Sequence, residues 1–358
     1  MKPTLLLLAG VSVLHAPVRA ADLEERTESR HHFGASLPVW LKAGAKFTAT
    51  RATNPGPAAG SAVDRFYDDG YNRVNAAGTP VLPPAGPFAM PRTSFFGYQS
   101  DGQVANLPAS PAAGGALSMH SVQLNGGDYG RSLDNQPLPG LEFFYRYDWK
   151  AGRNWQVSWE LAAAYNFFNW EQHGAPNSTV NLLTDVFALG GVVLPPGAPY
   201  DGPFTPTPFS PQIGSTPTRT EATVAAAVTG KRRLQLHAMQ FRAGPAFQWE
   251  PNANWQIGLQ GGLALGVGFS QLSFAEQITV ADPTVPVISQ SGRSSAAHFW
   301  AGLFSSLRIN RRLGEHWDAH VEIRHLLTDA IHHNGPTRSG EISLSEGFAV
   351  ATCVSYRF

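Results

Sequence analysis

The chain has 358 residues, with 26 Lys and Arg against 26 Asp and Glu, so it carries no formal net charge. The absence of a basic surplus or basic run argues against nucleic-acid binding. Charged residues make up only 15% of the chain, while 36 Gly, 28 Pro and 11% aromatic residues favour many short strands joined by loops.

The N-terminal 20 residues are predicted to be a cleaved secretory signal peptide. Lys2 supplies the positive start, an apolar stretch runs from Leu5 to Leu14, and small residues precede a cleavage site after Ala20. The stretch is too short for a membrane helix. Residues 21–38 are then expected to form a periplasmic tail. Since Cys353 is the lone cysteine, the chain has no intramolecular disulfide.

Eight segments have one parity that is predominantly apolar, as the lipid-facing side of a membrane β-strand must be. They lie at 39–50, 140–150, 155–169, 238–250, 255–271, 298–310, 317–328 and 346–358. In the clearest of them Leu259, Leu263 and Phe269 occupy odd positions, while Gln256 and Gln260 occupy even ones. Apart from Glu346 at a segment end, every charge in these segments falls on the polar parity, as expected if a charge facing mid-membrane lipid costs about 2–4 kcal/mol. The pattern predicts an all-β fold, a transmembrane antiparallel up-and-down β-barrel of eight strands.

A soluble two-sheet sandwich also alternates, with its apolar parity in the core. The tryptophans favour the membrane interpretation, because they flank three short turns at 150–154, 251–254 and 311–316. Trp gathers at membrane–water interfaces, where its ring is apolar and its N–H is polar. The predicted aromatic girdle consists of Trp149, Trp155, Trp249, Trp255 and Trp317.

Loop lengths set the predicted orientation. Short turns are typical of the periplasmic side and long loops of the extracellular side, which places both termini in the periplasm. The barrel is expected to occupy residues 39–358, with long loops at 51–139 and 170–237 and further connections at 272–297 and 329–345. Whether the first loop adds a hairpin to the barrel stays open. A bulge is predicted at Pro245, since proline breaks a strand ladder.

The chain ends Val354-Ser355-Tyr356-Arg357-Phe358. Tyr356 and the final Phe358 resemble the terminal assembly signal of outer-membrane barrels, which implies export to the bacterial outer membrane and contact with the barrel-assembly machinery. The eight-strand plan resembles the membrane domain of OmpA and the small OmpX-like barrels. The segments at 67–71 and 93–98 resemble uncharacterised long-loop outer-membrane barrels. These resemblances imply outer-membrane lipid and lipopolysaccharide as surroundings, and they imply no activity and no cofactor.

The polar parity places charges of both signs in the lumen, where they are predicted to pair, because buried ions persist only when paired. The predicted network consists of Lys42, Lys46, Glu142, Arg146, Asp148, Glu160, Arg242, Arg308, Asp318, Glu322, Arg324 and Arg357, with Glu250 near its edge. An eight-strand interior is just wide enough for side chains to fill it. A plugged lumen is therefore favoured over a proton or ion path.

Other candidate chemistry is weaker. His31-His32 and His332-His333 offer metal ligands but lack neighbouring Cys, so no metal site is predicted. His237, His298 and His325 lie near external strand ends without a recognisable Ser–His–acid spacing. The expected function is structural or loop-presenting, without catalysis or cofactor, toward an unidentified extracellular ligand. The alternatives are a small-solute channel or conduit for small apolar molecules, and an outer-membrane hydrolase or acyltransferase.

Overall fold

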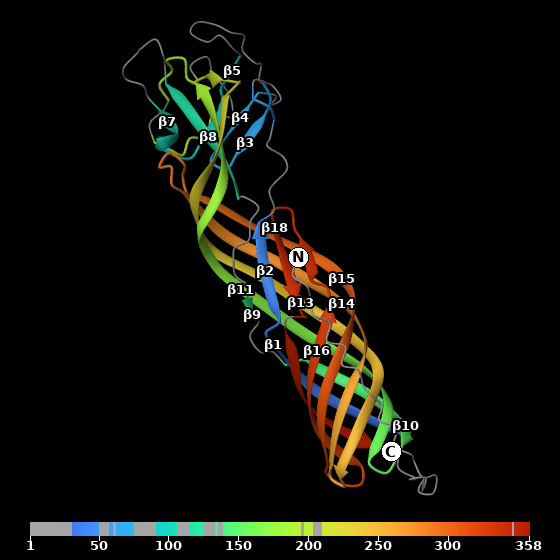
Figure 1. The fold of residues 1–358 in the computed structure, drawn as a ribbon. Coiled ribbons are helices and arrows are strands. Elements are labelled where there is room, and N and C mark those ends of the chain that lie inside the picture. Colours follow the sequence, from blue (N-terminus) through green and yellow to red (C-terminus); the bar gives the residue numbers. More distant parts are fainter. Residues whose placement is uncertain are drawn as a thin grey trace.

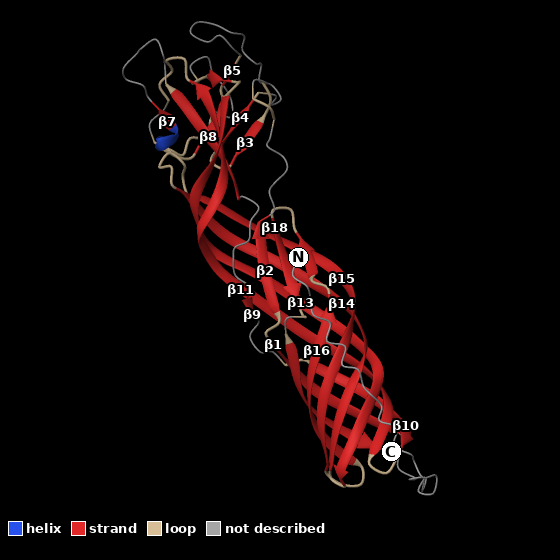
Figure 2. Cartoon of the chain, viewed as in Figure 1, coloured by secondary structure: helices blue, strands red, loops and turns tan. Residues whose placement is uncertain are grey.

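The structure is a computed structural model, and it describes residues 31–49, 57–59, 62–74, 91–105, 115–124, 133–134, 139–194, 197–202, 210–345 and 347–358. The predicted signal peptide and residues 21–30 of the predicted tail lie outside this range. The described residues are dominated by strands, with one short 3-10 helix at Asp101–Gln103 (Figure 2). None of the helical residues among them forms a helix that could cross a membrane.

Eight antiparallel strands form a closed ring. In chain order they are β1 (His31–Leu41), β10 (Leu141–Ala151), β11 (Trp155–Ala188), β13 (Thr218–Asn252), β14 (Trp255–Val280), β15 (Ile288–Arg312), β16 (Trp317–Thr328) and β19 (Phe348–Arg357). They are hydrogen-bonded in the order β10-β1-β19-β16-β15-β14-β13-β11, and pairing between β10 and β11 closes the ring. The predicted antiparallel all-β fold is confirmed.

The first strand of the ring differs from the prediction. β1 occupies His31–Leu41, so part of the expected tail at 21–38 is a strand of the ring. Lys42 then adopts a φ of 60°, and β2 (Gly44–Ala49) continues in a separate sheet, so a single strand at 39–50 is wrong. Pro38 lies where the continuous β1–β10 ladder has ended at Ser36, and its carbonyl still accepts a hydrogen bond from the Gly140 N–H at 2.6 Å, so proline removes one donor at the margin of this pairing.

Four strands continue far beyond their predicted ends. β11 and β13 have 34 and 35 residues, and β14 and β15 have 26 and 25. The predicted loops at 170–237 and 272–297 are therefore wrong over much of their length. The predicted bulge at Pro245 is also wrong, since Pro245 pairs with Trp159 in unbroken register.

A second, four-stranded sheet lies beside the outer half of the ring (Figure 1). It has the order β17-β18-β2-β9, where β17 is Ile331–Asn334, β18 is Arg338–Ser343 and β9 is Leu133–Asp134. Phe47, Ile331 and Ile342 of this sheet pack in one buried cluster with side chains of the ring. The sheet therefore covers the apolar interior of the long strands where the shorter ring strands have ended.

The far ends of β11 and β13 carry a set of short strands, here called the outer head. It contains β3 (Arg65–Tyr67), β4 (Gly70–Arg73), β5 (Arg92–Thr93), β6 (Phe95–Tyr98), β7 (Val104–Ala105), β8 (Ala116–Leu124) and β12 (Ile213–Gly214). β8 pairs with β11 at Val180–Ala188, and Phe96, Leu117 and Phe187 are fully buried in the head. Among the described residues of the 51–139 loop, none joins the closed ring. Figure 1 shows the head at one end of the molecule and the C-terminus at the other.

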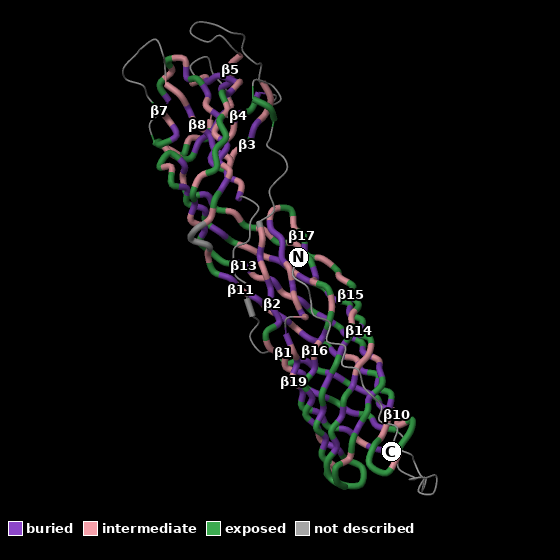
Figure 3. Tube along the Cα trace, in the orientation of Figure 1, coloured by how far each residue is buried: buried purple, intermediate pink, exposed green. Residues whose placement is uncertain are grey.

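Burial alternates along the ring strands (Figure 3). On β14, outward Leu263 and Phe269 are 63% and 70% exposed, whereas inward Ala264 and Ser270 are buried. Toward the outer head, the outward side chains become polar beyond Phe269 on β14 and beyond Met239 on β13. We call the lower zone the apolar band. Its exposed side chains include Leu37, Phe143, Leu161, Phe241, Leu259, Leu263, Phe299, Leu303, Val321, Ile323 and Val354.

The apolar band generates a first prediction. Leu263→Arg should lower the free energy of unfolding in lipid bilayers by about 2–4 kcal/mol, because the guanidinium would face hydrocarbon. Gln277→Arg is the matched control on the same strand and the same outward parity, but beyond the band. It should change stability little. Equal destabilisation in denaturant titrations of the two refolded variants would contradict the assignment of the band.

Candidate functional site

The middle of the ring interior holds three glutamates and three arginines. Alternation directs them inward, and the side chains are at most 4% exposed. The members are Glu142 on β10, Glu160 on β11, Arg242 on β13, Arg308 on β15, and Glu322 and Arg324 on β16. They come from five strands that are far apart in the chain, so the ring closure is what brings them together.

Paired hydrogen bonds link this central cluster. Arg324 donates from both terminal nitrogens to the two carboxylate oxygens of Glu142, at 2.9 Å each, and from Nε to Glu322 at 2.9 Å. Arg308 forms the same two-pronged contact with Glu160, at 2.8 and 2.9 Å, and reaches Glu322 at 3.0 Å. Arg242 lies 2.8 Å from Glu142. Each carboxylate therefore contacts at least one guanidinium, which offsets the loss of water around both charges.

A second cluster lies nearer the short turns. His32 Nε2 is 2.7 Å from Asp148 and its Nδ1 is 3.0 Å from Arg146. Asp318 lies between His32 and Arg357, at 3.7 Å from each. His32 was expected in a solvated tail, but β1 places it in the interior, where it is 3% exposed. The sequence does hold a signal for this, because His32, Gly34 and Ser36 alternate with Phe33, Ala35 and Leu37.

On the side of the central cluster that faces the outer head, the interior of the ring becomes apolar. Residues of this apolar layer come from β1, β11, β13, β14, β15 and β16, and each is buried to at least 93%. They are Trp40, Phe168, Trp170, Leu234, Leu236, Leu272, Trp300, Phe304 and Leu326. Gly266 leaves room for the indole of Trp300, with which a Cβ at this position would overlap. Sequence reasoning missed this layer because it sought apolar residues on the lipid-facing parity only, whereas these occupy the inward parity.

A further buried charge group lies beyond the apolar layer, where Glu276 binds two arginines. Arg232 contacts one carboxylate oxygen, and Arg338 donates to the other at 2.7 Å. Arg338 reaches this position from β18 of the second sheet, so the ion pairs join that sheet to the long strands. The prediction did not include these residues, because they lie in segments expected to be loops.

The remaining predicted network residues lie elsewhere. Lys42 is exposed at the turn between β1 and β2, and Lys46 on β2 lies opposite Glu341 in the second sheet. Their predicted place in the lumen is wrong, because the chain leaves the ring at Leu41. Glu250 pairs with Arg312 at 2.9 Å, near the short turns.

The predicted girdle residues all lie at the short-turn end. Trp149, Trp155, Trp249, Trp255 and Trp317 are 37–65% exposed. Tyr356 of the predicted assembly signal packs on the Trp317 ring, with centroids 5.1 Å apart, and on Phe358 at 5.3 Å. The aromatic residues of both groups therefore form part of one surface at this end of the ring.

Outward charges appear just above the apolar band. Glu171 on β11 lies 2.8 Å from both Lys231 and Arg233 on β13, and 2.9 Å from His173. The hydrogen bonds from Lys231 and then Arg233 lower the pKa of Glu171 to about 2. On β15, Arg293 donates to Gln271 at 2.5 Å. The outer surface thus changes from apolar to charged within a few residues.

A Ser–His group lies in the outer half of the interior. Ser270 Oγ is within hydrogen-bond distance of His298 Nε2 at 2.6 Å and of His333 Nδ1 at 2.5 Å, and Ser294 contacts the other nitrogen of His333. Ser270 is 2% exposed. Among the described residues no carboxylate hydrogen-bonds either imidazole. The group therefore has a hydroxyl and bases but lacks an accessible nucleophile and an orienting acid.

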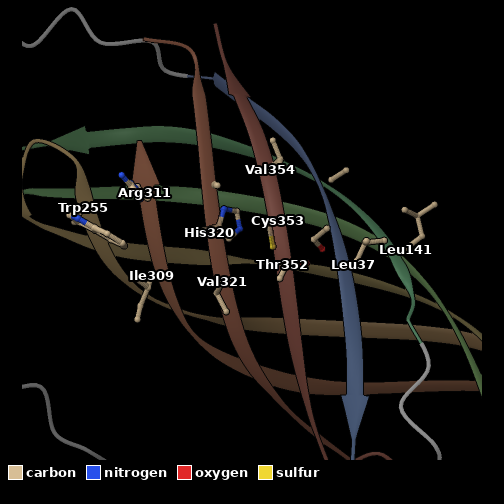
Figure 4. Close-up of a pocket in the computed structure, with 13 residues that line it drawn as sticks. Leu37, Leu141, Trp255, Ile309, Arg311, His320, Val321, Thr352, Cys353 and Val354 are labelled. Atoms are coloured by element: carbon tan, nitrogen blue, oxygen red, sulfur yellow. The ribbon is translucent and has the colours of Figure 1, made fainter. Parts of the chain in front are cut away.

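The outward face also carries a groove of about 670 Å³ across β1, β19 and β16 (Figure 4). Small outward residues, Ala35, Ala319 and Thr352, line it together with the larger Leu37 and Val354. Arg311, His320 and Cys353 also contribute to the lining, so the groove is a mainly apolar hollow in the outer surface of the ring.

No family model and no curated protein sequence matches the chain. Among solved structures, the outer membrane protein OprG from Pseudomonas aeruginosa is 10% identical, over 92% of this chain and 97% of that chain, with a TM-score of 0.34. The outer membrane protease OmpT from Escherichia coli is 9% identical, over 93% and 98%, with a TM-score of 0.27. A Pseudomonas aeruginosa FadL homologue is 10% identical, over 92% and 90%, with a TM-score of 0.18.

The central cluster generates a second prediction. Arg324→Ala removes one arginine partner from each of Glu142 and Glu322, and should lower the free energy of unfolding by about 3–5 kcal/mol, because three buried carboxylates then share two guanidinium groups. Arg233→Ala breaks an exposed ion pair with Glu171 and should cost about 1 kcal/mol or less. Urea titrations of the two refolded variants measure both effects. Similar small losses in both variants would contradict the claim that the central cluster is dry and tightly paired.

Proposed function

We propose that the protein is an eight-stranded outer-membrane β-barrel with a closed lumen, which holds the outer head at the cell surface and has no catalytic activity of its own. The observation that carries the proposal is the apolar band, in which large apolar side chains are exposed around the ring while the charged side chains at the same level point inward.

The band favours a membrane over water. Exposed apolar patches on soluble monomers rarely exceed a few hundred Å². A soluble sandwich would bury the apolar parity and expose the charged one, and this ring has the reverse arrangement. Its strands also have the length that a membrane requires, since Met239 to Trp249 spans the band on β13 and about 9–11 tilted residues cross a bilayer. Hydrocarbon would cover the band and the groove between β1, β19 and β16.

The two ends of the ring support an orientation. The short-turn end carries the tryptophans and the C-terminal aromatic residues, as expected on the periplasmic side after recognition by the barrel-assembly machinery. The opposite end carries Lys231, Arg233 and Arg293, which suit the phosphate groups of lipopolysaccharide. The predicted signal peptide is consistent with export to this membrane.

Two successive barriers support a closed lumen. The central cluster fills one level with paired charges, and the apolar layer fills the next with packed aromatic and aliphatic side chains. A small-solute channel needs a continuous water-filled path, which paired charges and packed indoles leave no room for. A conduit for small apolar molecules needs an open apolar cavity, and the same packing counts against it.

The geometry of Ser270 counts against the hydrolase or acyltransferase alternative. Its hydroxyl lies inside the protein between two imidazoles, so an acyl substrate in the membrane would not reach it. We interpret the Ser270 group as a structural hydrogen-bond network that joins β14, β15 and β17.

The outer head is the part that a surface partner would meet. Phe96 and Tyr98 are buried in its core, so these aromatic residues stabilise the head, whereas Phe66 and Val193 are 72% and 82% exposed. An ordered core permits the head to present a fixed surface at the ends of β11 and β13.

A topology experiment tests the proposal. In a Cys353→Ser background, Val193→Cys places a thiol on the outer head and Leu313→Cys places one in the short turn between β15 and β16, both at positions at least 60% exposed. A membrane-impermeant maleimide should label Val193→Cys in intact cells, and Leu313→Cys only after the outer membrane is permeabilised. Labelling of Leu313→Cys in intact cells would contradict the proposed orientation, because it would place the short turns on the outside of the cell.

A further inference from the structure

A histidine and the lone cysteine of the chain face each other inside the ring. His320 on β16 and Cys353 on β19 are directly paired across the two strands. The potential ligand atoms of His320, Cys353 and Glu322 all lie within 4.8 Å of one another. Figure 4 shows His320 and Cys353 side by side on neighbouring strands.

His320 is buried without a hydrogen-bond partner. Its residue surface is 4% exposed, and neither ring nitrogen has a partner among the described residues. The Phe144 ring packs against the His320 imidazole in an edge-on arrangement, with 5.4 Å between the two ring centroids. A buried polar group normally has a partner, so an unpartnered imidazole beside a thiol is the feature to explain.

Imidazole and thiolate together select soft metal ions. Thiolate sulfur favours Cu(I) and Zn(II), and imidazole nitrogen binds both. Glu322 adds an oxygen nearby, but it already accepts hydrogen bonds from Arg308 and Arg324. His320 and Cys353, the two neutral donors, are therefore the primary ligands. Two ligands suit Cu(I) better than Zn(II), because Zn(II) in structural sites is almost always bound by four ligands.

The charge of the surroundings distinguishes the two ions. The central cluster and the second cluster together contain five arginines and five carboxylates, so their charges balance. The arginines are Arg146, Arg242, Arg308, Arg324 and Arg357, and the carboxylates are Glu142, Asp148, Glu160, Asp318 and Glu322. Binding of a monovalent ion by Cys353 releases the thiol proton to solvent, and the thiolate then cancels the charge of the ion. A divalent ion would leave one positive charge uncompensated among the arginines, which a dry interior disfavours.

We propose that His320 and Cys353 form a binding site for a soft monovalent metal ion, Cu(I) in particular, with Glu322 as a neighbouring oxygen. The site lies in the inward wall of the ring and goes beyond the proposed role of the barrel in presenting the outer head.

The test uses the full chain refolded in detergent micelles, with Cu(I) maintained by ascorbate and bicinchoninate as the coloured competitor. The folded protein should withdraw one equivalent of Cu(I) per chain. Cys353→Ser and His320→Gln should each bind at least tenfold more weakly, while His332→Gln, an exposed histidine on β17, should bind as the unchanged chain does. Zn(II) should not displace the bound Cu(I).

Folding of each variant is checked by its heat-dependent migration in gels. If a variant fails to fold, the unchanged chain still decides the question, because Cys353 is its lone cysteine and a bound Cu(I) must produce a thiolate-to-copper charge-transfer band in the ultraviolet. Three results would overturn the proposal. The coloured Cu(I)–bicinchoninate complex could persist when the folded protein is added, the charge-transfer band could be absent, or folded Cys353→Ser could still bind one equivalent of Cu(I).

Discussion

Hydrocarbon cannot solvate a charge, and this constraint organises the ring. Each charged side chain at the level of the apolar band has to point inward, and once inside it needs a partner, because little water reaches it. Arg324 illustrates the result, since it binds Glu142 on β10 and Glu322 on its own strand. The strands therefore depend on one another for charge compensation as well as for backbone hydrogen bonds.

Beyond the apolar band the same strands carry different side chains, as expected if they leave the proposed membrane and enter water. Outward positions on β13 pass from Met239 to Arg233 and Lys231, while inward positions become Leu236 and Leu234. Water now covers the outside, and an apolar core is needed inside. The second sheet supplies the missing cover, and the Glu276 pairs with Arg232 and Arg338 attach it. In the proposed arrangement, the long strands therefore form a membrane barrel at the level of the apolar band and a water-covered β-structure toward the outer head.

The sequence predicts the strands in which the apolar side chains stay on the outward parity throughout. It does not predict the regions in which the apolar side chains change to the inward parity. The strand at 255–271 was located because a single parity stays apolar from Trp255 to Phe269. The first strand of the ring was predicted at 39–50 and not at His31–Leu41, because residues 21–38 were assigned to a tail although His32, Gly34 and Ser36 alternate with Phe33, Ala35 and Leu37. Lys42 and Lys46 were misplaced for the same reason. The pairings inside the lumen required the registers between strands, which the sequence does not contain.

The central claim is that paired charges and the apolar layer together close the ring. Planar-bilayer recording of the refolded, unchanged chain tests it most directly, because one conducting barrel gives a discrete current step. The account predicts a sealed bilayer without steady unitary currents at moderate voltages and salt, from protein that has been verified as folded and inserted. Reproducible steady steps from single barrels would contradict the account and would require a continuous aqueous path past Arg308 and Trp300.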